Sequence, residues 1–152
     1  MTIRFNSKTR ETAFLSNFYA ALVEYGGLRY PSVEHAYQAA KTLDPESRLA
    51  IAQAPSAVEA KQLGKRTRLR ADWDDIKISV MRELLEIKFR DPDLRARLLA
   101  TQNEPLSHKA PWDGYWGDGP DGRGQDLLGA LLMDLRDRLI LQAERQRAVA
   151  CI

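Results

Sequence analysis

The sequence predicts an α+β fold: a single, mainly α-helical domain with a small antiparallel β-sheet or hairpin. Three observations favour this class. Two glycines separate short β-type runs near the N-terminus, which favours a hairpin. Apolar residues recur at helical spacing over most of the chain from Ser32 onward. A chain of 152 residues is also long enough to bury a hydrophobic core without the support of disulfides or metals. We therefore expect one domain over residues 1–152.

The strands are expected within residues 1–31. The run LVEYGGLRYP at 22–31 places Gly26 and Gly27 between two short segments that contain valine, tyrosine and leucine, which is typical of a hairpin with a two-residue turn. Ile3 and Phe5 supply a further strand. Together they predict the small antiparallel sheet.

Helices are expected over most of the remaining chain. Ser32 and Ser56 occupy N-cap positions, and Glu59 completes a capping box with Ser56. Gly64 is expected to end the helix that Ser56 begins. Trp112, further along the chain, is interpreted as a packing residue. A core stripe is predicted in the last helix from leucines at helical spacing: Leu128, Leu131, Leu132, Leu135 and Leu139. The expected ranges are 33–43, 45–53, 57–63, 75–90, 94–100 and 127–145.

Composition narrows the classes of protein. A net charge of +2 gives no general argument for nucleic-acid binding, and the single Cys151 forms neither a disulfide framework nor a metal-binding spacing. No apolar run approaches the roughly 18 residues of a membrane span, and the N-terminus lacks a signal-peptide core. We expect a soluble, cytoplasmic protein that needs no cofactor or metal and binds no membrane, with its oligomeric state left open.

The segment 115–125, YWGDGPDGRGQ, has the composition of a ligand-binding loop. Its four glycines allow positive φ angles and close backbone approach, which a simple connector seldom needs. A helix that begins near Leu127 would direct unpaired N–H groups into this loop, and such groups attract phosphate or carboxylate. The alternative is a flexible, Asp/Gly-rich turn.

The helix after the hairpin presents two different faces. Small alanines on one side predict close packing, whereas Glu34, Tyr37, Gln38 and Lys41 fall at i, i+3, i+4 and i+7 on the other. Glu34 lies in the first turn, where the helix dipole favours an ionised carboxylate that can act as a base or stabilise a cation. The alternative is an ordinary solvated face.

Four segments in this order resemble the YbiA-like, or NADAR, family: LSNFY (15–19), YPSVEHAYQAAK (30–41), LGKRTRLRADWDDIKISVM (63–81) and YWGDGPDGRGQDLLGALLMDLR (115–136). They span nearly the whole chain. Two positions depart from the family pattern. Asp126 stands where the family commonly has asparagine, and Ser107-His108 replaces a more usual Val-Glu.

The resemblance implies an N-glycosidase that hydrolyses the ribose-to-base C–N bond of phosphorylated riboflavin-pathway intermediates. Glu34 is then the first choice for the carboxylate at the reacting sugar and Asp118 for the departing base, although which acid is base and which is proton donor stays open. The ligand cleft is expected between the Glu34 helix and the 115–125 loop. The expected substrate-binding residues are Asn17, Lys41, Arg66, Trp73, Trp116, Gly117, Gly119 and Arg123.

These residues have assigned roles and plainer alternatives. Trp73 or Trp116 would stack on the base, and Lys41, Arg66 and Arg123 would bind the substrate phosphate. The alternative for Trp73 is a core tryptophan, and for Arg66 a charge that compensates a helix C-terminus.

Rival functions are an ADP-ribosyl hydrolase that acts on guanine, and a non-catalytic module that binds NAD or ADP-ribose. A nucleic-acid binder built on the basic run 65–70 is a third, with a solvated charged segment as its alternative. The expected partner is a small phosphorylated nucleotide-like substrate, with nucleic acid only as an ADP-ribosylated substrate.

Overall fold

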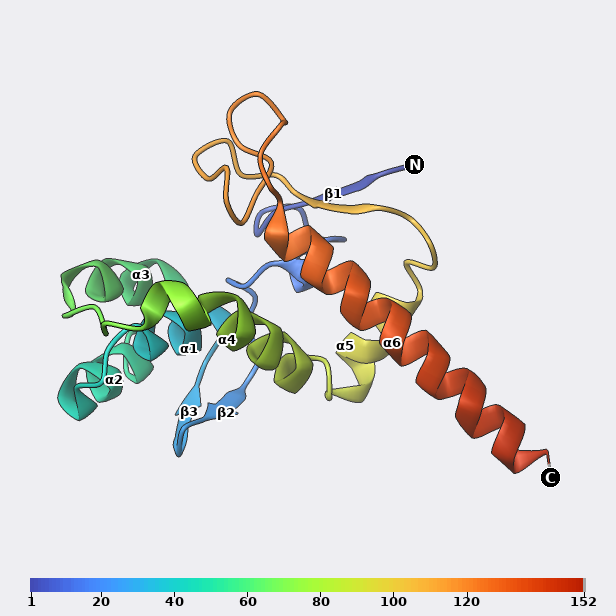
Figure 1. Ribbon diagram of the computed structural model, residues 1–152, viewed down its shortest axis with the longest axis horizontal. Coiled ribbons are helices and arrows are strands. Elements are labelled where there is room, and N and C mark those ends of the chain that lie inside the picture. The colour runs from blue at the N-terminus through green and yellow to red at the C-terminus, as the bar shows by residue number, and fades with distance from the viewer. Residues whose placement is uncertain (152) are drawn as a thin grey trace. The chain divides into compact units, whose positions relative to one another are not determined.

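The computed structural model describes residues 1–151 and has the predicted α+β, mainly helical character (Figure 1). It divides into two compact units, Asn17–Asp91 and Met1–Ser16 together with the chain from Pro92 onward. One domain over the whole chain stays a prediction. Within residues 1–151, no helix combines the length and apolar character that crossing a membrane requires.

The unit Asn17–Asp91 begins with the predicted hairpin. Strands β2 (Val23–Tyr25) and β3 (Leu28–Tyr30) pair antiparallel, with Val23 opposite Tyr30. Gly26 and Gly27 have φ angles of 57° and 84°. A two-residue turn between twisted strands requires two consecutive positive φ angles. The predicted hairpin turn at this glycine pair is therefore confirmed.

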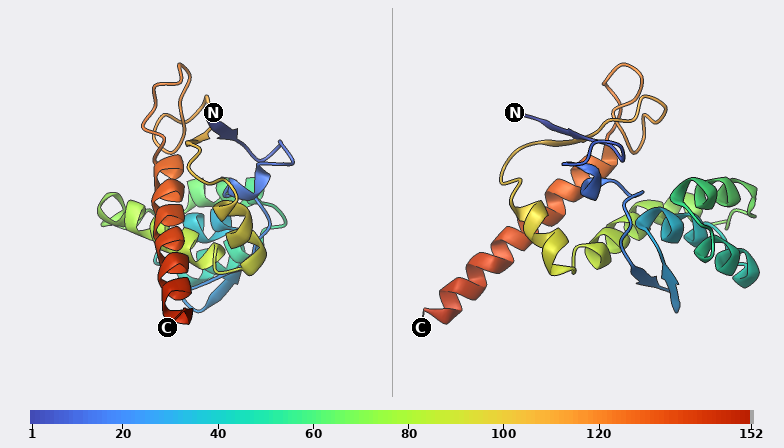
Figure 2. Two further views of the ribbon diagram at one scale, coloured as in Figure 1. Left: turned by 90° about the vertical axis from the view of Figure 1, so that its right-hand side faces the viewer. Right: turned by 180° about the vertical axis from the view of Figure 1, so that it is seen from behind.

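Four helices of this unit follow the hairpin within the described chain: α1 (Val33–Ala40), α2 (Pro45–Ala52), α3 (Ala57–Arg66) and α4 (Trp73–Lys88). Helix α1 packs against α2, α3 and α4, which surround it (Figure 2, cyan to green). Every residue of α1 is buried, the charged Glu34 included. This helix is therefore the centre of the unit rather than part of its surface.

Local hydrogen bonds explain where these helices begin. The Ser32 hydroxyl accepts the His35 N–H at 3.1 Å and the Ser56 hydroxyl accepts the Glu59 N–H at 3.2 Å, so both predicted N-caps are confirmed. The prediction that Gly64 ends its helix is wrong, because α3 continues to Arg66. Gly64 lies instead against α1, where a Cβ atom would come within 2.8 Å of Gln38 Cδ.

The other unit contains a second pair of strands. Strand β1 (Ile3–Phe5) pairs parallel with β4 (Leu106–His108), with Phe5 opposite His108. The expectation that residues 3–5 join the antiparallel N-terminal sheet is wrong, since their partner lies about a hundred residues away along the chain. A short 3-10 turn, η1 (Ala13–Leu15), follows β1.

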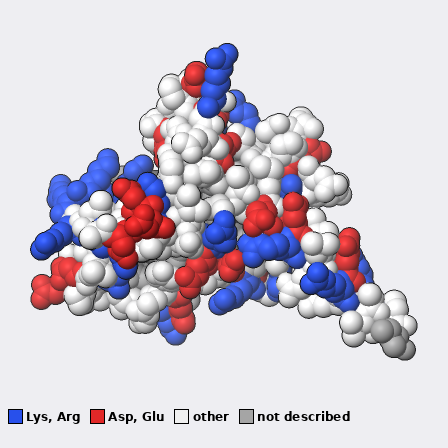
Figure 3. Space-filling model, in the orientation of Figure 1, with Lys and Arg blue, Asp and Glu red and all other residues white. Residues whose placement is uncertain are grey.

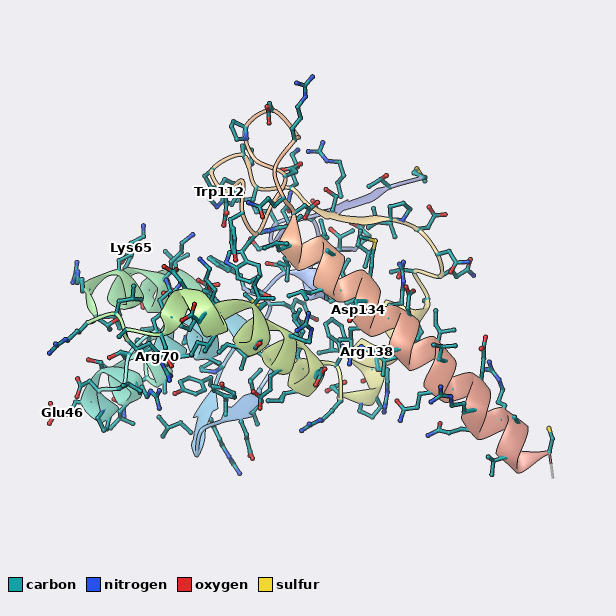
Figure 4. All side chains as sticks on the ribbon, viewed as in Figure 1. Glu46, Lys65, Arg70, Trp112, Asp134 and Arg138 are labelled. Atoms are coloured by element: carbon teal, nitrogen blue, oxygen red, sulfur yellow. The ribbon has the colours of Figure 1, made fainter. Side chains whose placement is uncertain are left out.

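Helices α5 (Pro92–Leu99) and α6 (Leu127–Ala150) complete this unit. Leucines 128, 131, 132 and 135 are buried, which confirms four of the five leucines of the predicted core stripe of α6, whereas Leu139 is half-buried. A Cβ at Gly129 would overlap the Leu106 carbonyl oxygen, so a glycine here lets α6 approach β4 closely. The packing role expected for Trp112 is wrong, because its side chain is 71% exposed on the loop before α6 (Figure 4).

Candidate functional site

Glu34 is a buried carboxylate in the first turn of α1. Its residue is 7% exposed, its N–H donates to the Asn17 carbonyl at 3.0 Å, and its Oε1 accepts from Gln38 Nε2 at 2.7 Å. Tyr37 and Gln38 are buried as well. The alternative of an ordinary solvated face is therefore wrong, and the polar stripe of this helix lies inside the protein.

Lys41 follows α1 on the same stripe and is half-buried. Burial lowers the pKa of Lys41 below its usual value, and the positive charges of Lys61 and Lys65 lower it further, while the Glu34 charge opposes them. Lys41 Nζ also lies 5.5 Å from the centre of the Tyr37 ring. The carboxylate of Glu34 thus lies within electrostatic reach of the Lys41 amine.

Asn17 supplies an unpaired buried acceptor next to Glu34. Its Nδ2 lies 3.5 Å from the Met81 sulfur, and its Oδ1 has no hydrogen-bond partner among residues 1–151. Burying an acceptor in this state costs free energy, which a ligand N–H can recover. Asn17 therefore fits a contact to an amide or amino group of a ligand.

Trp73 begins α4 and is 5% exposed. Its ring meets the Tyr37 ring edge to face, with centroids 5.1 Å apart. In this arrangement Trp73 supports Tyr37 and the polar stripe of α1. Stacking of Trp73 on a base stays a prediction.

Basic side chains gather at the end of α3. Lys65 and Arg66 end this helix and are exposed, as is Arg68 in the segment that follows. Figure 3 shows Lys and Arg concentrated over this part of the unit. The Arg70 N–H donates to the Lys41 carbonyl at 2.8 Å, which ties the basic segment to the end of α1.

The glycine-rich loop before α6 uses its amides internally. The N–H groups of residues 124–128 donate to carbonyls of Asp118, Gly114, Gly117, Tyr115 and Trp116. The prediction of unpaired amides at the start of α6 is therefore wrong for Leu127 and Leu128, the first two residues of the helix. The glycines allow the loop to close on itself: a Cβ at Gly124 would lie 2.7 Å from the Asp118 carbonyl carbon, and Gly119 has a φ of 72°.

Asp118 anchors this loop. Its Oδ1 accepts the Ala110 N–H at 2.9 Å, and its Oδ2 accepts from the Arg4 guanidinium at 2.5 Å. Burial raises the pKa of Asp118, but the Ala110 N–H and Arg4 outweigh it, so the pKa lies below its usual value. Asp118 is consequently a carboxylate at neutral pH.

Both departures from the family pattern meet in one contact. Ser107 Oγ donates to Asp126 Oδ2 at 2.6 Å, and the His108 N–H donates to Asp126 Oδ1 at 3.0 Å. The two substitutions are thus coupled, because the serine hydroxyl supplies a donor that a valine lacks. Asp126 also has a φ of 51°, a conformation that aspartate and asparagine both tolerate.

The remaining loop residues have mixed environments. Trp116 is half-buried, and its ring centre is 5.0 Å from that of Tyr115. The backbone N–H of Trp116 donates to Asp113 Oδ1. Gly117 is buried against Ala110, and Arg123 is exposed.

Residues 4–140 match the sequence model of the NADAR domain. The chain belongs to the NADAR domain family. It is 39% identical over 143 residues to the N-glycosidase YbiA of Escherichia coli, covering 92% of this chain and 89% of that protein. The solved NMR structure of E. coli YbiA is similar with a TM-score of 0.84 and 38% identity, over 93% of this chain and 86% of that one. A riboflavin biosynthesis protein of Vibrio vulnificus is 36% identical over 140 residues, which are 90% of this chain and 38% of that protein.

The predicted site residues of this NADAR domain fall into two groups. Asn17, Glu34, Lys41, Arg66 and Trp73 belong to the unit Asn17–Asp91, whereas Trp116, Gly117, Asp118, Gly119 and Arg123 belong to the other. Around Glu34, sequence reasoning placed Gln38 on the right stripe but assigned it no function. Its spacing of four residues after Glu34 was the available signal. No group of three or more potential metal ligands occurs within residues 1–151.

Proposed function

We propose that this NADAR domain hydrolyses the C–N bond between a ribose phosphate and an aminopyrimidine base, as in riboflavin-pathway intermediates. The reaction class is supported by the N-glycosidase relatives that match along most of their length. The riboflavin-type substrate is supported by the names of the relatives from Vibrio vulnificus and Zea mays. The observation that carries the proposal is the buried Glu34 carboxylate, oriented by Gln38 and within reach of the Lys41 charge.

Glu34 would act at the anomeric carbon. Cleavage of an N-glycosidic bond develops positive charge on this carbon and on the ring oxygen, so a nearby carboxylate stabilises the transition state. The same carboxylate can orient water and accept its proton as the water oxygen bonds to the anomeric carbon. The C–N bond electrons leave with the base, which must then be protonated.

Asp118 is proposed to assist the departing base. Its lowered pKa fits a hydrogen-bond acceptor that relays a proton from water better than it fits a proton store. Glu34 therefore takes the water-orienting role, and Asp118 the relay. Trp116 is the candidate to stack on the base if Trp73 keeps its buried position against Tyr37.

Substrate binding is assigned to side chains. Lys41 and Arg66 would hold the phosphate, with Arg123 as a further candidate cation. The Asn17 Oδ1 would accept an N–H from an amino group of the base, since this buried acceptor lacks a partner within residues 1–151. Gly117 and Gly119 would shape the loop that carries Trp116.

The test compares two Glu→Gln variants. Glu34→Gln should lower kcat on a phosphoribosyl-aminopyrimidine by about 100-fold or more while substrate affinity stays within about tenfold. Glu46→Gln is the matched control, because Glu46 also lies in the first turn of a helix but is exposed. Release of free base would be followed by chromatography. Unchanged kcat in Glu34→Gln would refute the assignment, and ligand binding without base release by the unaltered protein would favour the non-catalytic module.

The second candidate is removal of ADP-ribose from guanine in nucleic acid. It is favoured by the exposed basic residues at the end of α3, which the Arg70 backbone ties to Lys41. Phosphate-driven binding weakens by orders of magnitude between low and physiological salt. Release of ADP-ribose from a modified oligonucleotide, with a steep salt dependence that Lys65→Ala reduces, would favour this substrate over the free nucleotide.

A further inference from the structure

We propose that Gln38 is a positioning residue that holds the Glu34 carboxylate in its reactive orientation, and that residue 64 is glycine because the Gln38 amide occupies the space of a side chain. This inference rests on the proposed N-glycosidase function for its catalytic part. Its packing part stands on the structure alone.

The hydrogen bond between Gln38 and Glu34 is buried and short. The two residues lie one turn apart on α1, Gln38 is 3% exposed, and its Nε2 donates to Glu34 Oε1 at 2.7 Å. A donor to an ionised carboxylate forms a stronger bond than a donor to a neutral oxygen. The amide thereby restricts the side-chain torsions of Glu34.

The orientation of the amide follows from the charge. With the opposite orientation, the Gln38 oxygen would lie at 2.7 Å from a carboxylate oxygen, and two acceptors would oppose each other. The NH₂ group therefore faces Glu34, and the amide oxygen faces α3. Among residues 1–151 this oxygen has no hydrogen-bond partner.

Gly64 makes this orientation sterically permitted. A Cβ at position 64 would overlap the Gln38 amide oxygen and would lie 2.8 Å from Cδ and 2.9 Å from Cβ of the same side chain. Gly64 lies inside α3, where alanine is the better helix former, so its helical conformation does not require glycine. The close approach of Gln38 does.

A small shift of Glu34 has a large effect in this arrangement. A displacement of about 1 Å at a reacting group can cost about 100-fold in rate, because the aligned geometry provides much of the acceleration. Loss of the Gln38 amide should thus lower kcat and leave KM nearly unchanged, since Gln38 is assigned no contact with substrate.

The first experiment replaces the donor and keeps the volume. In Gln38→Met, kcat on the phosphoribosyl-aminopyrimidine should fall about 10- to 100-fold, with KM within about threefold. The melting temperature should fall by several degrees because a buried hydrogen bond to a carboxylate is lost, so kcat is measured well below the unfolding transition. Gln38→Glu keeps the shape but sets two carboxyls side by side, so its activity should also move along the pH axis. Gln62→Met, an exposed glutamine on α3, is the matched control. Wild-type kcat and pH profile in both Gln38 variants would overturn the positioning role.

The second experiment needs no activity and separates this inference from the proposed function. Gly64→Ala should lower the melting temperature although alanine is the better helix former, because the methyl group displaces Gln38. Alanine at position 38 lacks the two atoms that crowd position 64 most, the amide oxygen and Cδ. Gly64→Ala should therefore lower the melting temperature much less in the Gln38→Ala background than in the wild type. A higher melting temperature for Gly64→Ala alone would overturn the packing inference.

Discussion

Replacing Asp118 with asparagine keeps the shape of the side chain and removes its charge. The variant retains an oxygen for the Ala110 N–H, now 2.9 Å from Asp118 Oδ1. On the other side, an NH₂ group would face the Arg4 guanidinium, so a charge-assisted hydrogen bond at 2.5 Å becomes a contact between two donors. The loop before α6 would lose one of its fixed attachments to β1.

The structure sets the size of the effect. A hydrogen bond to a charged group contributes about 1.5–3 kcal/mol, but the Arg4 side chain is 54% exposed and water screens part of this. We expect Asp118→Asn to lower the free energy of unfolding by about 1–2 kcal/mol at pH 7. For a chain of this size, the melting temperature should fall by about 2–8 °C.

The difference between the two proteins should depend on pH in one direction. The pKa of Asp118 lies below its ordinary value of 3.8, so the folded state favours the charged form. The contribution is fully present above pH 3.8 and is lost as the pH falls through the lower folded pKa. The difference in the free energy of unfolding between wild type and Asp118→Asn should therefore become smaller as the pH falls below 3.8.

Urea unfolding at pH 7 and pH 3, with Arg4→Ala and the double variant, would measure this coupling. The reasoning would be refuted if wild type and Asp118→Asn differed equally in free energy of unfolding at both pH values. It would also be refuted if the effects of Asp118→Asn and Arg4→Ala were additive in the double variant. Activity at 25 °C, below the unfolding transition, reports on catalysis. A fall in kcat of more than about 100-fold in folded Asp118→Asn would support the relay to the departing base.

Three further predictions concern the substrate and the loop. Lys41→Ala should lower kcat/KM about 30- to 150-fold on a phosphorylated substrate and much less on the matching nucleoside; equal losses would contradict a phosphate contact. Asp126→Asn should leave kcat/KM within about threefold, because Ser107 and His108 already engage this carboxylate, and a large gain would instead reveal repulsion of the phosphate. Hydrolysis should persist in EDTA, since a carboxylate suffices to orient water; loss of activity that a divalent ion restores would show otherwise.

Short-range signals in the sequence predicted much of the fold. The Gly26-Gly27 turn and the caps Ser32 and Ser56 depend on neighbours within a few residues, and each was found as expected. The pairing of β1 with β4, in contrast, was not predicted. Three residues give too weak a periodic signal, and a parallel partner about a hundred residues away leaves no local mark.

Gly64 shows why part of the site escaped prediction. A glycine after a helical run favours a helix end, and the sequence cannot distinguish this from a glycine that admits a side chain of another helix. The spacing of Glu34 and Gln38 predicted a shared face. The contact of Gln38 with α3 depends on how three helices pack, which no single segment encodes.

The glycine-rich loop presents the same ambiguity with a chemical consequence. Four glycines suit a loop that binds an anion, and they equally suit a loop whose amides donate to its own carbonyls. The amides of residues 124–128 donate to carbonyls of the loop itself. Their hydrogen bonds leave little of the helix N-terminus for a phosphate. If the substrate is phosphorylated, side-chain charges such as Lys41 and Arg66 must therefore supply most of the attraction. Binding through such half-buried and exposed charges should weaken with added salt, whereas a buried cradle of amides would be far less sensitive.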